Sequence, residues 1–167
     1  DQDQLQLIEF STAQRRWRSR AGFMPAAERQ AARRWLAALQ ASGGTEMQSA
    51  VLESMRSLRD DAQSQVLLVT DGLVGFEREI VQALLRQLPA NCRFHVLGVG
   101  PASNRALTCA VARAGRGIEA IVGLGEAPAA AALRLSARMG APRRRRTARR
   151  GTRSGGGRDR RAGPWPA

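Results

Sequence analysis

The sequence predicts an α/β protein in which a mainly parallel sheet lies between two layers of helices. Two apolar, β-branched runs, at residues 65–70 (QVLLVT) and 93–99 (RFHVLGV), have the composition of strands covered on both faces. Between them, apolar residues recur every three or four positions, which is the spacing of an amphipathic helix. Strand and helix alternate along the chain, and this alternation favours parallel strands joined by right-handed crossovers.

The first third of the chain predicts two strands and a helix. Residues 4–10 (QLQLIEF) form a short apolar stretch that favours a buried strand. Residues 14–20 are short and charged, which suits an edge strand because charges discourage pairing with other chains. Pro25 is tolerated in the first turn of a helix that runs to Gln40, with helical spacing of Ala32, Trp35, Leu36 and Leu39.

The middle of the chain predicts helix, strand and helix in turn. The run from Ser42 to Thr45 breaks the preceding helix, so Thr45 stands at the start of the next one. The apolar stripe of that helix consists of Met47, Val51, Met55 and Leu58. The strand at residues 65–70 then ends at Asp71. A second helix follows, with the stripe Phe76, Ile80, Leu84 and Leu88, and stops at Pro89 and Asn91.

The last part of the predicted domain repeats the pattern twice. After the strand at 93–99, Ser103 or Asn104 caps a helix that ends at Gly115 and Gly117. Residues 118–122 form a short strand, and Pro128 opens an Ala-rich helix that ends at Gly140. We therefore expect one domain over residues 1–140.

The net charge of +13 belongs mostly to a tail. From Arg143 to the end there are 10 Arg and one Asp, whereas residues 1–142 hold 17 Arg and 13 acids, a net of +4. Residues 141–167 also contain almost no aliphatic side chain, and we expect this Arg/Gly/Pro-rich tail to be disordered. The Arg-rich tail leaves open an alternative function, binding to nucleic acid or to an acidic surface. Deleting the tail would test it, because such binding should be sensitive to salt and should be lost without the tail.

Other whole-chain features narrow the class of protein. Cys92 and Cys109 are too few for a disulfide framework and lack metal-knuckle spacing, so both are interpreted as core residues. No apolar run approaches the length of a membrane span. The chain opens with Asp-Gln-Asp-Gln and no initiator Met, and we expect it to begin inside a longer protein.

Two oxygen-bearing side chains, Thr45 and Asp71, follow elements that should end at the ligand-binding edge of the sheet. In an open parallel sheet, ligands bind beyond the carboxyl ends of the strands. A hydroxyl and a carboxylate are hard donors suited to Mg²⁺ or Mn²⁺. Thr45 also has the simpler interpretation of a helix N-cap, with Gly43 and Gly44 as the turn before it.

Catalytic alternatives are poorly supported. The sequence Gly98-Val99-Gly100 lacks the third glycine of a dinucleotide loop, because position 103 is Ser. His95 lies in the middle of a strand, so it does not suit a catalytic triad, and no GxSxG is present. Asp71 as an aspartyl nucleophile would require a second Asp where Leu73 stands. We predict no catalytic residues and no enzyme activity.

The ordered segments LQLIEFS, ASGGTEM, QVLLVTDGLVG, RFHVLGVGPASN and ARAGRG resemble the von Willebrand factor A domain, which has a Rossmann-like three-layer fold. The similarity covers about residues 3–125. The runs GGTEM and TDGLVG are most similar to bacterial proteins that join such a domain to an inter-α-trypsin-inhibitor-like (VIT) N-terminal domain. The resemblance implies a protein-binding or adhesion module, exported or associated with the cell envelope of a bacterium.

The resemblance also implies a metal-ion-dependent adhesion site (MIDAS). In the family, a DxSxS motif, a Thr and an Asp hold a divalent cation, and Thr45 and Asp71 resemble the last two. No Asp-x-Ser-x-Ser occurs in these residues, so the site is incomplete here. We expect Mg²⁺ (or Mn²⁺/Ca²⁺) in the intact parent, weak or absent binding in this chain, and a partner protein that offers an acidic residue to the metal.

The sheet order of the family has a further implication. Its first strand lies between the strands predicted here at 4–10 and 65–70, and this chain is expected to lack that strand and the helix after it. The flanking strands should then either close up on each other or expose unpaired backbone and apolar side chains. We therefore expect a marginally stable chain.

Overall fold

The computed structural model describes residues 3–41, 43–56, 58–71, 77–100, 104–123 and 125–140. The tail predicted to be disordered, residues 141–167, lies outside the described residues. The strands are β1 (Gln4–Leu5), β2 (Ile8–Phe10), β3 (Gln14–Arg16), β4 (Gly22–Phe23), β5 (Ser64–Thr70), β6 (Cys92–Val99) and β7 (Arg116–Val122). The helices are α1 (Ala26–Ala37), α2 (Met47–Met55), α3 (Glu77–Gln87), α4 (Arg105–Ala114) and α5 (Pro128–Gly140).

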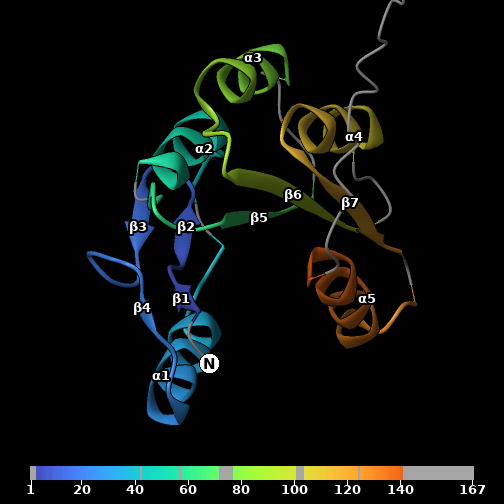
Figure 1. Cartoon of the computed structure of the whole chain (residues 1–167). Helices are drawn as coiled ribbons and strands as arrows, with labels where there is room; N and C mark the ends of the chain where they lie inside the picture. Colours follow the sequence, from blue (N-terminus) through green and yellow to red (C-terminus); the bar gives the residue numbers. More distant parts are fainter. Residues whose placement is uncertain are drawn as a thin grey trace, which may run out of the picture.

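The predicted α/β fold with a parallel sheet is confirmed in the second half of the chain. Strands β5, β6 and β7 pair in that order and in parallel, and α3 and α4 are the crossover helices. Helices α3 and α4 lie on one face of this sheet and α5 lies on the other (Figure 1). Strand β6 is covered on both faces, as its unbroken apolar run predicts. The same prediction is wrong for β5, because α5 packs against β7 and leaves Leu67 and Val69 of β5 exposed.

The N-terminal strands differ from the prediction. The single strand expected over residues 4–10 is wrong: β1 pairs with β4, whereas β2 pairs with β3, both antiparallel. The break falls at Gln6, whose side-chain oxygen accepts a bond from the Leu7 N–H (3.0 Å) and whose amide donates to the Arg18 carbonyl (2.6 Å). A polar side chain that binds the backbone in this way redirects the chain away from a continuous ladder. Only Gln14–Arg16 of the predicted strand at 14–20 is a strand.

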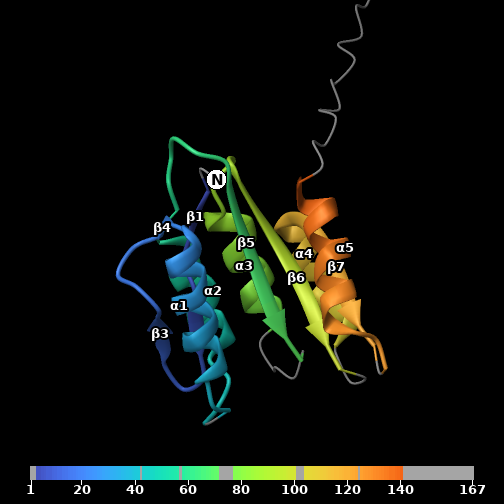
Figure 2. The same ribbon diagram turned by 90° about the horizontal axis from the view of Figure 1, so that it is seen from below.

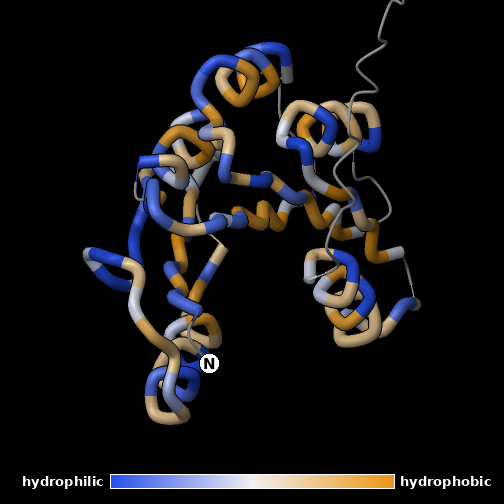
Figure 3. Tube along the Cα trace, viewed as in Figure 1, coloured by the Kyte–Doolittle hydropathy of each residue, from blue (hydrophilic) through white to orange (hydrophobic). Residues whose placement is uncertain are grey.

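A single apolar core joins the two halves of the described structure. Its buried residues come from α2, β5, α3, β6 and α4, and Phe10 of β2 packs against them. Figure 3 shows the hydrophobic stretch that runs along the strands in the middle of the molecule. The core members are Met47, Val51, Met55, Leu68, Ile80, Leu84, Leu88, Cys92, Phe94, Val96, Leu107, Val111 and Ala112.

Strands β2 and β5 are not paired with each other in the described part of the chain. Strand β2 pairs with β3 and β5 pairs with β6, so the strands form three separate sheets. Of the two outcomes expected for the flanking strands, the structure has the open one. Leu67 and Val69 of β5 are 41% and 51% exposed.

Local details support the helix boundaries and the close packing of β6 and β7. The predicted cap of α4 is confirmed, because the Asn104 side chain accepts a hydrogen bond from the Leu107 N–H (3.1 Å). At Gly117 the backbone approaches β6 so closely that an added Cβ would lie 2.0 Å from the Phe94 carbonyl oxygen. Glycine is therefore required where β7 joins the sheet.

Candidate functional site

The carboxyl ends of the parallel strands form one edge of the molecule. Because β5, β6 and β7 are parallel, their last residues lie at the same edge, and Asp71 directly follows β5. Figure 2 shows these strand ends and the segment that joins α1 to α2 at the lower end of the view. That segment contains Thr45. The structure thus places both predicted ligands on segments at the edge where open α/β sheets bind ligands.

The loop that carries Thr45 is held against the end of β2. The Glu46 N–H donates to the Ser11 carbonyl oxygen over 2.8 Å, which fixes the loop to the residue after β2. Gly43 has a φ of +77°, and an added Cβ would lie 2.9 Å from the Thr12 Cγ2 atom. Glycine at position 43 is therefore required by the tight turn against Thr12.

Thr45 itself is exposed and does not cap α2. The N-cap residue is Glu46, with φ −85° and ψ 60°, and no side chain caps the helix. The N-cap interpretation of Thr45 is thus wrong. Thr45 is instead one of the residues that line an open depression of about 320 Å³. The lining residues are Glu9, Phe10, Ser11, Leu39, Gln40, Ala41, Gly43, Gly44 and Thr45.

Asp71 is exposed and follows the buried Thr70. An exposed carboxylate and an exposed hydroxyl are hard oxygen donors of the kind that Mg²⁺ accepts. In the described ranges no three His, Cys, Asp or Glu residues gather in a group able to hold a metal ion. Thr45 and Asp71 therefore fit a divalent cation in chemistry, but as two donors they supply only a minor part of its coordination shell.

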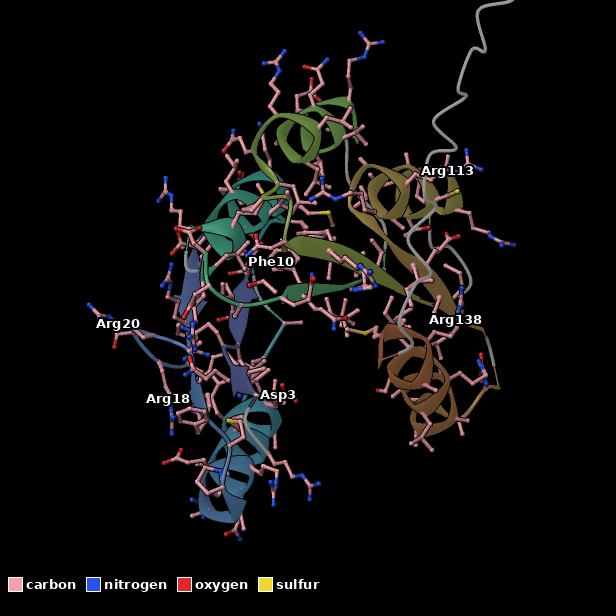
Figure 4. The ribbon with its side chains drawn as sticks, viewed as in Figure 1. Asp3, Phe10, Arg18, Arg20, Arg113 and Arg138 are labelled. Atoms are coloured by element: carbon pink, nitrogen blue, oxygen red, sulfur yellow. The ribbon has the colours of Figure 1, made fainter. Side chains whose placement is uncertain are left out.

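The depression beside Thr45 was not predicted from the sequence. Its polar lining includes Glu9, which lies on β2 and whose Oε2 accepts from the Arg15 Nε over 3.0 Å. Figure 4 labels Phe10 on the inner side of β2, whereas Arg18 and Arg20 lie on the outer side.

The remaining sequence candidates lie away from this edge or have structural roles. His95 is buried within β6, where its Nδ1 accepts a hydrogen bond from the Ile118 N–H (3.2 Å). Burial raises the pKa of the Cys92 thiol, which opposes thiolate chemistry there. Gly100 has a φ of +93° and its N–H donates to the Val122 carbonyl. Residues 101–103 of the nucleotide-loop comparison lie outside the described residues.

The described strands and helices define an open-sheet α/β domain. Residues 1–121 match the family model described as von Willebrand factor type A domain, and the chain belongs to this family. Domains of this family generally mediate protein interactions, and they are typically non-catalytic. This match confirms the resemblance noted in the sequence.

Solved structures support the same fold. The conserved hypothetical protein BatB from Bacteroides thetaiotaomicron is similar with a TM-score of 0.59 and 17% identity, covering 81% of this chain and 78% of that one. An aerotolerance-related membrane protein from Bacteroides fragilis NCTC 9343, solved with multiple mutations to serines, has a TM-score of 0.67 and 17% identity, covering 83% and 80%. No curated protein matches the chain.

Proposed function

We propose that this chain is a non-catalytic protein-binding domain whose ligand face is the edge that carries Thr45 and Asp71. The observation that carries the proposal is the placement of two exposed oxygen donors on segments at the carboxyl edge of the parallel sheet. Family membership supports a protein as the ligand. The bound partner would offer an acidic side chain, because an anion complements a cation held at this edge.

Thr45 and Asp71 would hold one side of a divalent cation, and that cation would attract a carboxylate of the partner. The loop contact between Glu46 and Ser11 positions Thr45, and the end of β5 positions Asp71. Further donors must complete the shell, so the described residues alone should bind the cation weakly. We also propose that a DxSxS motif of the intact parent protein supplies these further ligands, and that the parent joins this domain to a VIT domain.

Paramagnetic NMR with Mn²⁺ tests the site even when binding is weak. We expect line broadening to concentrate at residues 44–46 and 70–71 in the full chain and to disappear in Asp71→Ala. The matched control is Asp60→Ala, which removes an exposed carboxylate elsewhere and should leave the broadening unchanged. Broadening centred on other carboxylates, or persisting unchanged in Asp71→Ala, would contradict the metal proposal and leave direct protein recognition.

We also propose an association with the bacterial cell envelope. One structural neighbour is described as a membrane protein, and this supports the proposal by analogy of fold. Within the described residues, no helix is both long and apolar enough to cross a membrane. The alternative of nucleic-acid or acidic-surface binding depends on residues 143–167, which the structure does not describe.

A further inference from the structure

The positive charge of the domain is concentrated in one segment of the chain. Residues 14–41 hold seven Arg and one Glu, whereas residues 1–13 hold three acids and no Arg, and residues 42–142 hold ten Arg and nine acids. The basic segment forms β3, β4 and helix α1, and α1 lies at the far end of the molecule from α3 (Figure 1). The excess positive charge is therefore a local feature of this end.

The two glutamates nearest in sequence to this segment are paired with arginines on the strand side of α1. Glu28, the one acid of α1, forms an ion pair with Arg18 of the segment between β3 and β4. Glu9 of β2 accepts a hydrogen bond from the Arg15 Nε over 3.0 Å. The guanidinium carbon of Arg15 lies 5.4 Å from the centre of the Trp35 ring of α1. These contacts link one side of α1 to the strands and neutralise both glutamates there.

The outer side of α1 has no acidic side chain. The exposed residues of this helix, which we call the basic face, are Ala26, Ala27, Arg29, Gln30, Arg33, Arg34, Leu36 and Ala37. Small alanines between the arginines let the helix approach a flat anionic surface closely, while the long arginine side chains reach its charged groups. Asp3, which precedes β1, is the other described acid at this end (Figure 4). The basic face itself is therefore uniformly positive.

Exposed apolar side chains accompany these arginines. Leu36 is 48% exposed and follows Arg33 by three positions, so the two are neighbours on the helix surface. Phe23 of β4 is 56% exposed, and the carbonyl of the next residue, Met24, accepts a hydrogen bond from Arg29 of the basic face over 2.7 Å. Arginines beside exposed apolar side chains fit the surface of an anionic bilayer, because the arginines attract headgroups and the apolar groups enter the acyl boundary.

We propose that the basic face, together with Phe23, binds the surface of a membrane that contains anionic phospholipid. Nucleic acid fits less well, because single strands are commonly held by stacking of bases on aromatic rings. The rings of Trp17 and Trp35 are already covered on one side by guanidinium groups, whose carbons lie 4.2 and 5.4 Å from the ring centres. The inference rests on the proposed envelope association for the presence of such a membrane, and it does not involve the edge proposed to hold the metal.

Flotation of the full chain with vesicles in EDTA tests this proposal apart from the metal site. The vesicles contain equal parts of phosphatidylcholine and phosphatidylglycerol. Arg33→Gln/Arg34→Gln should weaken binding about tenfold, since each arginine near such a surface strengthens binding by about fivefold. The matched control Arg78→Gln/Arg113→Gln removes the same charge from exposed positions of α3 and α4 and should weaken binding less than about twofold. Residues 141–167 are identical in both variants, so their contribution cancels.

A second pair of variants tests the apolar part of the surface. Phe23→Ser/Leu36→Ser should weaken vesicle binding at least about fivefold, because less apolar surface is buried in the bilayer. Leu85→Ser/Leu133→Ser changes side chains that are 68% and 73% exposed on α3 and α5 and should bind as the unmodified chain does. Circular dichroism verifies that all four variants remain folded. Binding of a single-stranded oligonucleotide should be the same for Phe23→Ser/Leu36→Ser and the unmodified chain.

Four results would overturn the proposal. Two are equal vesicle binding by the two arginine variants and equal binding to vesicles of phosphatidylcholine alone. The third is an unchanged affinity of Phe23→Ser/Leu36→Ser for vesicles, which would show attraction to anions in general. The fourth is a loss of oligonucleotide binding in Arg33→Gln/Arg34→Gln without a loss of vesicle binding, which would assign the basic face to nucleic acid. Vesicle binding measures the surface itself, so its failure is distinct from a failure of the envelope association, which concerns location in the cell.

Discussion

Adjacent glycines in the loop before α2 have different structural roles. Gly43 adopts a positive φ and faces Thr12 at a distance that leaves no space for a Cβ. At Gly44 an added Cβ would lie 3.7 Å from the Thr12 Cγ2 atom, which is an ordinary contact. The shape of the loop that presents Thr45 therefore depends on the first glycine and not on the second.

Gly43→Ala should destabilise the chain by roughly 1–2 kcal/mol, because the left-handed backbone conformation penalises a Cβ and Thr12 must also move. Gly44→Ala is the matched control and should change the free energy of unfolding by less than about 0.5 kcal/mol. Urea unfolding followed by circular dichroism measures both. Equal free energies of unfolding for the two variants would show that the turn is not constrained as described.

For single residues, the sequence predicts which side chains can accept a hydrogen bond better than it predicts where the backbone places them. Asn104 was predicted as a cap, and its bond to the Leu107 N–H confirms it. Thr45 had the same signal, a hydroxyl before an apolar stripe, but capping also requires the right backbone angles, and Glu46 occupies the cap position. Its exposed hydroxyl and the depression beside it depend on the contact with Ser11, which is distant in sequence.

Among the elements, helix α5 is linked to the end of β7 through the carboxylate of Glu126. Glu126 lies between β7 and α5, where its carboxylate accepts from the Gly123 N–H (3.4 Å) and forms an ion pair with Arg134 of α5. The hydrogen bond from Arg134 lowers the pKa of Glu126. A lowered pKa in the folded state means that the ionised carboxylate stabilises the fold.

This contribution should be present above the pKa of Glu126 in the unfolded chain and should be lost as the pH falls through its lower folded value. Glu126→Gln is therefore expected to lower Tm at pH 7 and to leave Tm nearly unchanged once the carboxyl is protonated in both states. The effect is small because the pair is exposed. Thermal scans from pH 7 to acid, with Glu79→Gln on α3 as control, measure it; a pH-independent difference would contradict the assignment.

The element predictions succeeded for the amphipathic helices and for the two continuous apolar strands. Helices α3, α4 and α5 and strands β5 and β6 lie within a few residues of their predicted bounds. The strand predicted at 4–10 is wrong because its break depends on a side-chain bond from Gln6 to Arg18, twelve residues away. Strand β4 is two residues long, too short to have a periodicity.

For the whole molecule, the class of fold was predictable from the sequence, but the interruption of the sheet between β2 and β5 was not. Alternating strands and helices predict a parallel sheet, and hydrophobic periodicity predicts which helix faces are buried. Periodicity does not report which strands lie next to one another, since strand order depends on tertiary packing. The separation of β2 from β5 was anticipated only through the family resemblance.

The separation of β2 from β5 leads to a prediction about the thermal stability of the whole chain. Exposed apolar side chains on β5 and unpaired strand edges reduce the surface buried on folding, so we expect a thermal midpoint below about 45 °C, the lower limit typical of mesophilic domains. Calorimetry together with circular dichroism measures it, and scans at several protein concentrations separate unfolding from aggregation. A single cooperative transition at high temperature would contradict this expectation.

Helix α2 connects the hairpin formed by β2 and β3 to the rest of the core. It contacts β2, β3 and α3, and Arg16 of β3 forms an ion pair with Glu53 (2.5 Å). The joint therefore consists of side-chain contacts and of the backbone hydrogen bond from Glu46 to Ser11, with no backbone ladder across it in the described residues. Apolar contacts weaken on cooling. Near freezing, we therefore expect the apolar part of this joint to hold the hairpin less tightly, which leaves the ion pair and the Glu46–Ser11 hydrogen bond as the main links between hairpin and core.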